Sequence, residues 1–253
     1  VVLSYLKTTY DKTEKEPDVT IEGLVKGTDY SVTYSNNVNA GTATVTIVGM
    51  NDYVGTLYQY FTIEPAKMTG FSVHGYKGTY DESSHTITLD GVPEGAVVTY
   101  ASEESGIYSE MKPDRRSAGT TTVYYKIKKA NYEELKGCVE IVIEAAPIAE
   151  KKVELSDVSY VYDGTAKSPN VAIAGMIRGI DFTVLYSKNV DAGTGTVTVE
   201  GIGNYKGVLY QYFTIEPAEL TGISAQGYTG EYDKKSHTII LQGVPEGAVV
   251  TYA

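Results

Sequence analysis

The sequence predicts an all-β protein built from tandem, small, antiparallel β-sandwich modules. Three observations predict this fold class: apolar residues recur at every second position, turn residues separate the alternating runs at short intervals, and no apolar stripe follows a helical period. The chain also repeats itself along its length, which indicates several similar modules instead of one large domain.

The strand pattern is clear in the first fifty residues. Tyr30, Val32 and Tyr34 alternate with serine or threonine, and the run from Ala43 to Ile47 alternates in the same way. A period of two is typical of a sheet that buries one face. Residues typical of turns separate the alternating runs, at 39–41 (Asn-Ala-Gly), 93–95 (Pro-Glu-Gly), 191–193 (Asp-Ala-Gly) and 201–204 (Gly-Ile-Gly-Asn).

A long internal repeat governs the organisation of the chain. Residues 1–101 align without a gap to residues 153–253, and 61 of the 101 aligned positions are identical. Some blocks are unchanged, such as YQYFTIEPA at 58–66 and 210–218. Agreement of this kind indicates a tandem duplication.

A weaker repeat of the Tyr-Asp, V-T-Y and A-G-T motifs divides each period again. We therefore predict four modules, at 1–66, 67–152, 153–218 and 219–253, the last of which is a partial copy of the start of module 2 and needs further strands to fold. Prolines Pro65, Pro147 and Pro217 stiffen the junctions, so we expect a rod. Ig-like sandwiches suit the short strands, with β-grasp-like modules as the alternative.

Composition excludes several classes of protein. The 253 residues carry a net charge of −11, which opposes binding to nucleic acid. No apolar run reaches the length of a membrane span, and the chain begins without a signal-peptide pattern, so we expect no membrane insertion and a processed chain or a fragment. Cys138 has no partner cysteine, and we expect it to be a small buried hydrophobic residue.

The sequence offers no pattern typical of catalysis. His74, His85 and His237 stand in strand-like runs without the spacing of a zinc site, and motifs for a phosphate loop or an activated serine are absent. We expect these histidines to be solvated or locally hydrogen-bonded. The sequence therefore predicts a protein that is not an enzyme and that needs no cofactor or metal.

The first candidate binding site is a loop found only in module 2. Residues 102–117 stand where module 1 has a short turn, and they include Tyr108, Met111, Arg115 and Arg116. Loops on rigid scaffolds often carry recognition. We hypothesise that this insertion contacts a ligand.

The second candidate is a repeated tyrosine pair. Tyr58 and Tyr60, like Tyr210 and Tyr212, alternate with the phenylalanine that follows, so they lie on the face opposite to that ring. They could pack at the junction with the next module or form a ligand platform.

These motifs resemble the MBG and YDG families of bacterial Ig-like surface repeats. The resemblance is carried by Tyr-Asp-Gly at 162–164, the A-G-T turn, Gly-Asn-Tyr-Lys-Gly at 203–207 and Phe-Thr-Ile at 213–215, and it is best in modules 1 and 3. It implies a secreted or wall-attached bacterial protein whose modules serve as stalks or adhesive domains, with no catalytic residues. Modules 2 and 4 depart from it, because they lack the Tyr-Asp-Gly glycine and the proline of positions 17 and 169.

The leading function is therefore an extracellular adhesin-like segment that presents or forms a host-ligand-binding region. A host glycoprotein, a mucin or an immunoglobulin would be the partner. Three alternatives remain open: an immunoglobulin-binding, superantigen-like module of a gut bacterium, a pure stalk or spacer, and a carbohydrate-binding accessory module. Neither composition nor motifs select among them.

Overall fold

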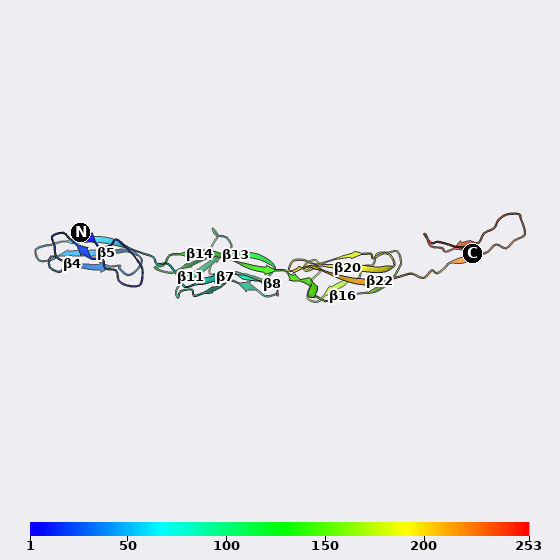
Figure 1. The fold of residues 1–253 in the computed structure, drawn as a ribbon, viewed down its shortest axis with the longest axis horizontal. Helices are drawn as coiled ribbons and strands as arrows, with labels where there is room; N and C mark the ends of the chain where they lie inside the picture. The colour runs from blue at the N-terminus through cyan, green and yellow to red at the C-terminus, as the bar shows by residue number, and fades with distance from the viewer. Residues whose placement is uncertain (253) are drawn as a thin grey trace. The chain divides into compact units, whose positions relative to one another are not determined.

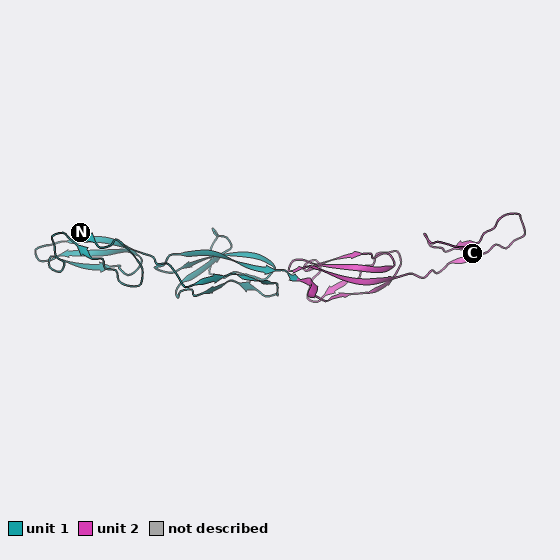
Figure 2. Ribbon diagram, in the orientation of Figure 1, with its two compact units in different colours: residues 1–146 teal, residues 147–253 magenta. Residues whose placement is uncertain are grey.

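Alternating apolar and polar side chains place the chain in β-strands. The computed structural model describes residues 1–252, which contain one 3-10 turn, η1 (Ile148–Glu150), and no α-helix (Figure 1). The all-β prediction is confirmed, and the β-grasp alternative, which needs a helix packed across its sheet, does not describe residues 1–252. The chain forms two compact units, 1–146 and 147–253 (Figure 2).

Module 1 has a four-stranded sheet and a smaller two-stranded one. Antiparallel pairing joins β4 to β5 and β5 to β6, while β2 runs parallel to β6 at the edge. The inward residues of β5 and β6 pack with Val19 and Tyr30 to form the core. The strands are β1 (Val2–Leu3), β2 (Lys7–Thr9), β3 (Val19–Thr20), β4 (Tyr30–Ser35), β5 (Gly41–Gly49) and β6 (Thr56–Glu64), with β1 paired to β3.

Module 2 repeats this plan with extra short strands. Its main sheet has the order β11-β13-β14-β8, and β8 again runs parallel to the last strand, β14. Ile87, Val123 and Ile141 are fully buried at its centre. The strands are β7 (Ser72–His74), β8 (Tyr76–Thr79), β9 (His85–Thr86), β10 (Thr88–Asp90), β11 (Val97–Ala101), β12 (Asp114–Arg115), β13 (Gly119–Lys128) and β14 (Leu135–Glu144).

Module 3 has the topology of module 1. Its main sheet has the order β17-β22-β20-β19, with β17 parallel to β22. Phe182, Val197 and Phe213 are buried in its core, and Ile148 of η1 is buried with them. The strands here, and the short one before η1, are β15 (Ala146–Pro147), β16 (Val153–Leu155), β17 (Ser159–Val161), β18 (Val171–Ile173), β19 (Phe182–Ser187), β20 (Gly193–Gly201), β21 (Tyr205–Lys206) and β22 (Val208–Glu216).

Module 4 forms only one strand pair among its described residues. β23 (Ser224–Gln226) pairs with β24 (Ile240–Gln242), in the register of β7 with β10 in module 2. Ile239 is 41% exposed, whereas its counterpart Ile87 is completely buried. The difference arises because β13 and β14, which cover Ile87 in module 2, have no counterpart in residues 219–252.

The repeated motifs have specific structural roles. The glycine of the A-G-T motif starts a long strand in three modules, with φ of 139° at Gly41, 128° at Gly119 and 137° at Gly193. Residues with a Cβ rarely adopt this conformation, so the motif requires glycine there. The V-T-Y tyrosine also recurs for a reason: in modules 1 and 3 the hydroxyl groups of Tyr34 and Tyr186 donate hydrogen bonds of 2.6 Å to the Pro17 and Pro169 carbonyls.

Candidate binding surfaces

The insertion at 102–117 is an ordered loop held at both ends. Near its start, Tyr100 and Ser109 exchange two backbone hydrogen bonds of 2.7 and 2.9 Å. Near its end, β12 pairs with β9, so that Arg115 lies opposite His85. The loop therefore forms a fixed surface on module 2.

Arg115, which we predicted to contact a ligand, is instead occupied within the module. Its guanidinium donates to the carbonyl oxygens of Ser117 and Ala118 at 2.8 and 2.7 Å and to the Thr121 hydroxyl at 2.9 Å. These bonds close the loop at its base. The Arg115 side chain thus positions the loop, while Arg116 beside it is exposed.

Two apolar side chains of the loop are largely exposed. Met111 is 81% exposed, and Ile107, the isoleucine of the same insertion, is 96% exposed. Two apolar side chains on an exposed loop are a feature of recognition surfaces when they stand on a rigid base. Met111 and Arg116 remain predicted contact residues.

Tyr108 lies at the inner side of the loop, above the outward face of the sheet. Its hydroxyl donates to the Glu104 carbonyl at 3.1 Å, and the ammonium of Lys126 lies 3.6 Å from the centre of its ring. A cavity of about 190 Å³ opens beside it, lined by Tyr108, Glu104, Tyr124, Lys136, Gly137 and Cys138. The cavity lies between the loop and the strands β13 and β14. The sequence alone did not predict that the loop and these strands meet.

Cys138 is exposed, and our expectation of a buried cysteine was wrong. The reason is the alternation along β14, where Val139, Ile141 and Ile143 point toward the core. Cys138 therefore points outward, opposite Tyr124 of β13.

The repeated tyrosines lie on the outward face of each main sheet. Tyr58 is 57% exposed and Tyr212 is 59% exposed, and Tyr60 and Tyr210 are alike. Phe61 and Phe213 point into the cores, as the alternation predicted. The tyrosines are too exposed to be packed at a junction, and threonines on β5 and β20 flank them. They form two polar aromatic surfaces, on module 1 and on module 3.

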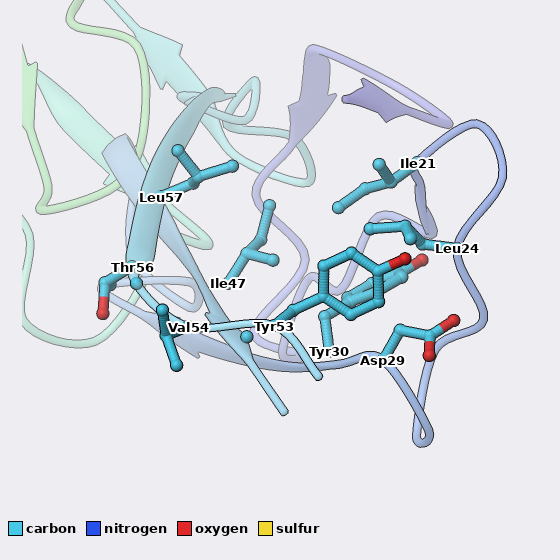
Figure 3. A pocket seen from close by; sticks show the side chains of 11 residues that line it. Ile21, Leu24, Asp29, Tyr30, Ile47, Tyr53, Val54, Thr56 and Leu57 are labelled. Atoms are coloured by element: carbon cyan, nitrogen blue, oxygen red, sulfur yellow. The ribbon is translucent and has the colours of Figure 1, made fainter. Parts of the chain in front are cut away.

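A second cavity opens at one end of module 1, where the β5–β6 turn meets the segment before β4. It has a volume of about 290 Å³ and is mainly apolar. Figure 3 shows Ile21 and Leu24 facing Ile47, with the Tyr53 ring beside Tyr30. We call it the module 1 cavity, and its main lining residues are Ile21, Leu24, Tyr30, Ile47, Tyr53 and Leu57.

A carboxylate and a basic side chain four residues apart recur in every module, but the basic residue differs. Lys15 and Lys167 pair with Asp11 and Asp163, and each of these carboxylates also accepts hydrogen bonds from a threonine. The lysine hydrogen bond, followed by the threonine ones, holds the pKa of both carboxyl groups well below the ordinary value of 3.8.

Histidine replaces the lysine in modules 2 and 4. His85 lies 2.9 Å from Asp81 and stacks on Tyr76, with ring centres 3.8 Å apart. His237 lies 2.8 Å from Asp233 in the same way. The histidine hydrogen bond lowers the pKa of Asp81 and of Asp233. Both histidines are thus locally hydrogen-bonded, as we expected, and so is His74, which contacts Ser72 at 2.9 Å.

Within residues 1–252, no three or more His, Cys, Asp or Glu side chains gather as metal ligands would. The same range contains no helix with the length and apolar character to cross a membrane.

Comparisons with known proteins give remote structural likenesses only. No protein-family model and no curated protein matches the chain. Among solved structures, the EC1-4 region of PcdhgB3 aligns at 11% identity and a TM-score of 0.24, over 72% of this chain and 58% of that chain. The protocadherin gammaB7 EC3-6 cis-dimer aligns at 10% identity and a TM-score of 0.27, over 76% of this chain and 66% of that one.

A glycan-binding protein is also among these structures. SGBP-B from the mixed-linkage glucan utilization locus of Bacteroides ovatus, solved with a mixed-linkage heptasaccharide, aligns at 12% identity and a TM-score of 0.20. The alignment covers 74% of this chain and 60% of that chain. This chain thus spans less than two thirds of each of the three structures, and the TM-scores do not extend the likeness to function.

Proposed function

We propose that the chain is a non-enzymatic segment of an extracellular bacterial surface protein of the MBG/YDG type, and that its modules present a host-ligand-binding region. The insertion at 102–117 carries this proposal. Arg115 and β12 fix the base of the loop, while Ile107 and Met111 stand almost fully in solvent at its tip. Contacts within module 2 already order the loop, so a partner loses less conformational entropy when it binds there. This favours binding by the exposed side chains of the loop.

The cavity below the loop adds polar recognition groups. Tyr108 and Tyr124 supply aromatic faces, and the Lys126 and Lys136 ammonium groups lie on neighbouring strands of the same outward face. Aromatic and cationic groups of this kind suit a glycoprotein, a mucin or an immunoglobulin. We propose that the partner contacts the loop tip and this cavity together.

The test is direct binding of the full chain to purified immunoglobulin, mucin and serum glycoproteins. Ile107→Asp and Met111→Asp change only exposed side chains, so they should weaken binding at least about tenfold without unfolding module 2. Leu185→Asp, at an exposed aliphatic position of module 3, is the matched control and should bind like the parent chain. Equal binding by all of these variants would show that the loop does not contact the partner.

A second candidate function is carbohydrate binding at the exposed tyrosine pairs. The supporting observation is their repetition on the same outward face of modules 1 and 3, each flanked by threonine hydroxyl groups. Double replacement of Tyr58 and Tyr60 by serine should then halve the number of glycan sites and leave binding at the loop unchanged. Absence of any binding, to glycans and to host proteins, would indicate a spacer.

A further inference from the structure

Below the insertion at 102–117, the outward face of module 2 carries two lysines side by side. Lys126 of β13 lies directly opposite Lys136 of β14, and like charges at directly opposed positions destabilise a strand pair. Modules 1 and 3 do not have two lysines at the same place, which begins seven residues after the A-G-T glycine. The pairs that stand there are Val48 with Thr56 and Glu200 with Val208.

The two lysines are short of carboxylate partners. In the described part of the chain, no carboxylate forms an ion pair with Lys126, whose half-buried side chain lies instead over the Tyr108 ring. Lys136 contacts Glu134 at 3.2 Å, but the same carboxyl group also lies 2.8 Å from Lys128. One carboxylate thus serves two ammonium groups, and a third has only an aromatic face. This surface favours an anionic group from a ligand.

A small side chain makes room beside the lysines. Cys138 occupies the β14 position that Tyr58 has on β6 and Tyr210 has on β22, three residues before the first buried residue of the strand. Both tyrosines are 57% exposed, so a ring at this position projects from the sheet. With cysteine there, a cavity of about 190 Å³ remains between the sheet and the loop, and we call it the module 2 cavity. Sites for drug-sized ligands measure about 300–1,000 Å³, so this one suits a single small ring.

The lining of the module 2 cavity indicates a ligand with both hydroxyl groups and a negative charge. The rings of Tyr108 and Tyr124 present faces on which the C–H side of a sugar ring can pack. The Glu104 carboxylate also lines the cavity, and because it only accepts hydrogen bonds it favours a donor such as a hydroxyl group. The Lys136 ammonium only donates, and its best acceptor is an anion. An inorganic anion would supply no donor to Glu104 and would be repelled by it.

We propose that the module 2 cavity binds an acidic sugar, a saccharide unit that carries a carboxylate or a sulfate ester. Its anionic group would lie between the ammonium groups of Lys126 and Lys136. Its ring would pack on Tyr124, and one of its hydroxyl groups would donate to Glu104. The inference rests on the proposed function, because such a sugar would belong to the glycoprotein or mucin that the loop contacts. It adds the chemistry that this partner must carry.

The test is a ligand-observed NMR titration of the full chain with three probes. Sialyllactose carries a carboxylate, sulfated lactose carries a sulfate ester, and lactose carries no charge. Saturable binding of at least one acidic probe is expected in the roughly millimolar range, because one small cavity supplies few contacts. Lactose should bind at least about tenfold more weakly, since it lacks the charge-assisted hydrogen bonds. Added salt should weaken the binding of the acidic probe.

Two lysine variants locate the anionic group. Lys126→Gln and Lys136→Gln remove one charge each, so each should weaken binding of the acidic probe at least about fivefold. Both variants also remove the like-charge pair, so module 2 should stay folded, which hydrogen exchange in β13 checks. Lys77→Gln, at an exposed lysine of β8 that does not line the cavity, is the matched control and should bind like the parent chain.

A third variant fills the cavity. Cys138→Tyr introduces the ring that modules 1 and 3 carry at this exposed position, so it should abolish binding of the acidic probe without unfolding the sheet. Glu140→Tyr places the same ring two residues further along the outward face of β14, at the position of Tyr60 on β6. It does not line the cavity and should bind like the parent chain.

Three outcomes would overturn the inference: no saturable binding of either acidic probe, equally tight binding of lactose, and undiminished binding by both lysine variants. Its failure is distinct from failure of the proposed function. Host-protein binding that Ile107→Asp weakens, without any binding of acidic sugars, would overturn only the acidic-sugar inference. Binding of an acidic probe by a chain that captures no host protein would support the inference and contradict the proposed function.

Discussion

Modules 1 and 3 share a topology, a core and most of their sequence, yet they differ at one end. In module 3 the cavity between the β20–β22 sheet and the segment before β19 is closed by Ile148, and in module 1 the corresponding cavity is open. The comparison teaches that the core of module 3 includes a residue from the segment that precedes the module, because Ile148 is buried with Ile173, Phe182 and Val199. The described residues of module 1 supply the other walls of the same space, Ile21, Tyr30 and Ile47.

The largest expected effect comes from emptying the filled end. Ile148→Ala should destabilise module 3 by about 2–5 kcal/mol, because it removes buried methyl groups and leaves a cavity. Leu57→Ala in module 1 should cost less than about 1 kcal/mol, since that side chain is already half exposed. Hydrogen exchange in β22 and in β6 measures the two effects separately, as the chain has several modules and one melting temperature does not resolve them.

A second difference lies in the cores, where Gly195 of module 3 replaces Ala43 of module 1. A Cβ built on Gly195 would come within 2.3 Å of the Phe213 ring, so Gly195→Ala should destabilise module 3 by about 1–3 kcal/mol. In module 1 the alanine is tolerated opposite Phe61. Rescue of Gly195→Ala by Phe213→Leu, followed by thermal melting, would confirm overpacking as the cause, and a lack of rescue would contradict it.

The side chain of Asn131 gives a smaller effect, at the junction of modules 1 and 2. It accepts a hydrogen bond of 2.9 Å from the Ala40 amide and donates one of 2.9 Å to the Asn39 side chain. Asn131→Ala should cost about 1–2 kcal/mol in the local stability of the A-G-T turn. Faster exchange of the Ala40 amide, with unchanged exchange of the Ala192 amide in module 3, is the expected result.

The smallest effect is the acid sensitivity that modules 1 and 3 share. The folded state lowers the pKa of Asp11 and Asp163 below 3.8, so the unfolded chain binds more protons in acid and the stabilisation is lost as pH falls through the lowered pKa. Asp163→Asn should flatten the decline of module 3 stability between about pH 4 and pH 2 and leave that of module 1 unchanged. Melting curves across this range check it, and an unaltered slope would contradict the pairing with Lys167.

The sequence predicted which segments form strands better than it predicted which strands pair with one another. Alternation identifies which side chains of β4 and β5 point inward, and the glycine of each A-G-T motif indicates a turn. The parallel pairing of β2 with β6 could not be predicted in this way, because alternation reports the buried face and not the adjacent strand. Cys138 was predictable in principle, since Val139 and Ile141 fix the inward positions of its strand.

The candidate sites were predictable only in part. The length of the 102–117 insertion and the outward direction of Tyr58 and Tyr60 follow from the sequence. The role of Arg115 does not, because its partners are mainly backbone carbonyls that only the folded loop brings within reach. The module 1 cavity depends on packing at one end of a sheet, and neither its volume nor its lining can be read from the order of residues.

The parallel pair at the edge of each main sheet has a mechanical consequence. In module 1, β2 near the start and β6 at the finish run side by side in the same direction, and β8 with β14 and β17 with β22 repeat the arrangement. Tension applied along the chain pulls the two strands past each other, so their hydrogen bonds bear the load together and must break together. We therefore expect each of these modules to resist stretching by a high unfolding barrier.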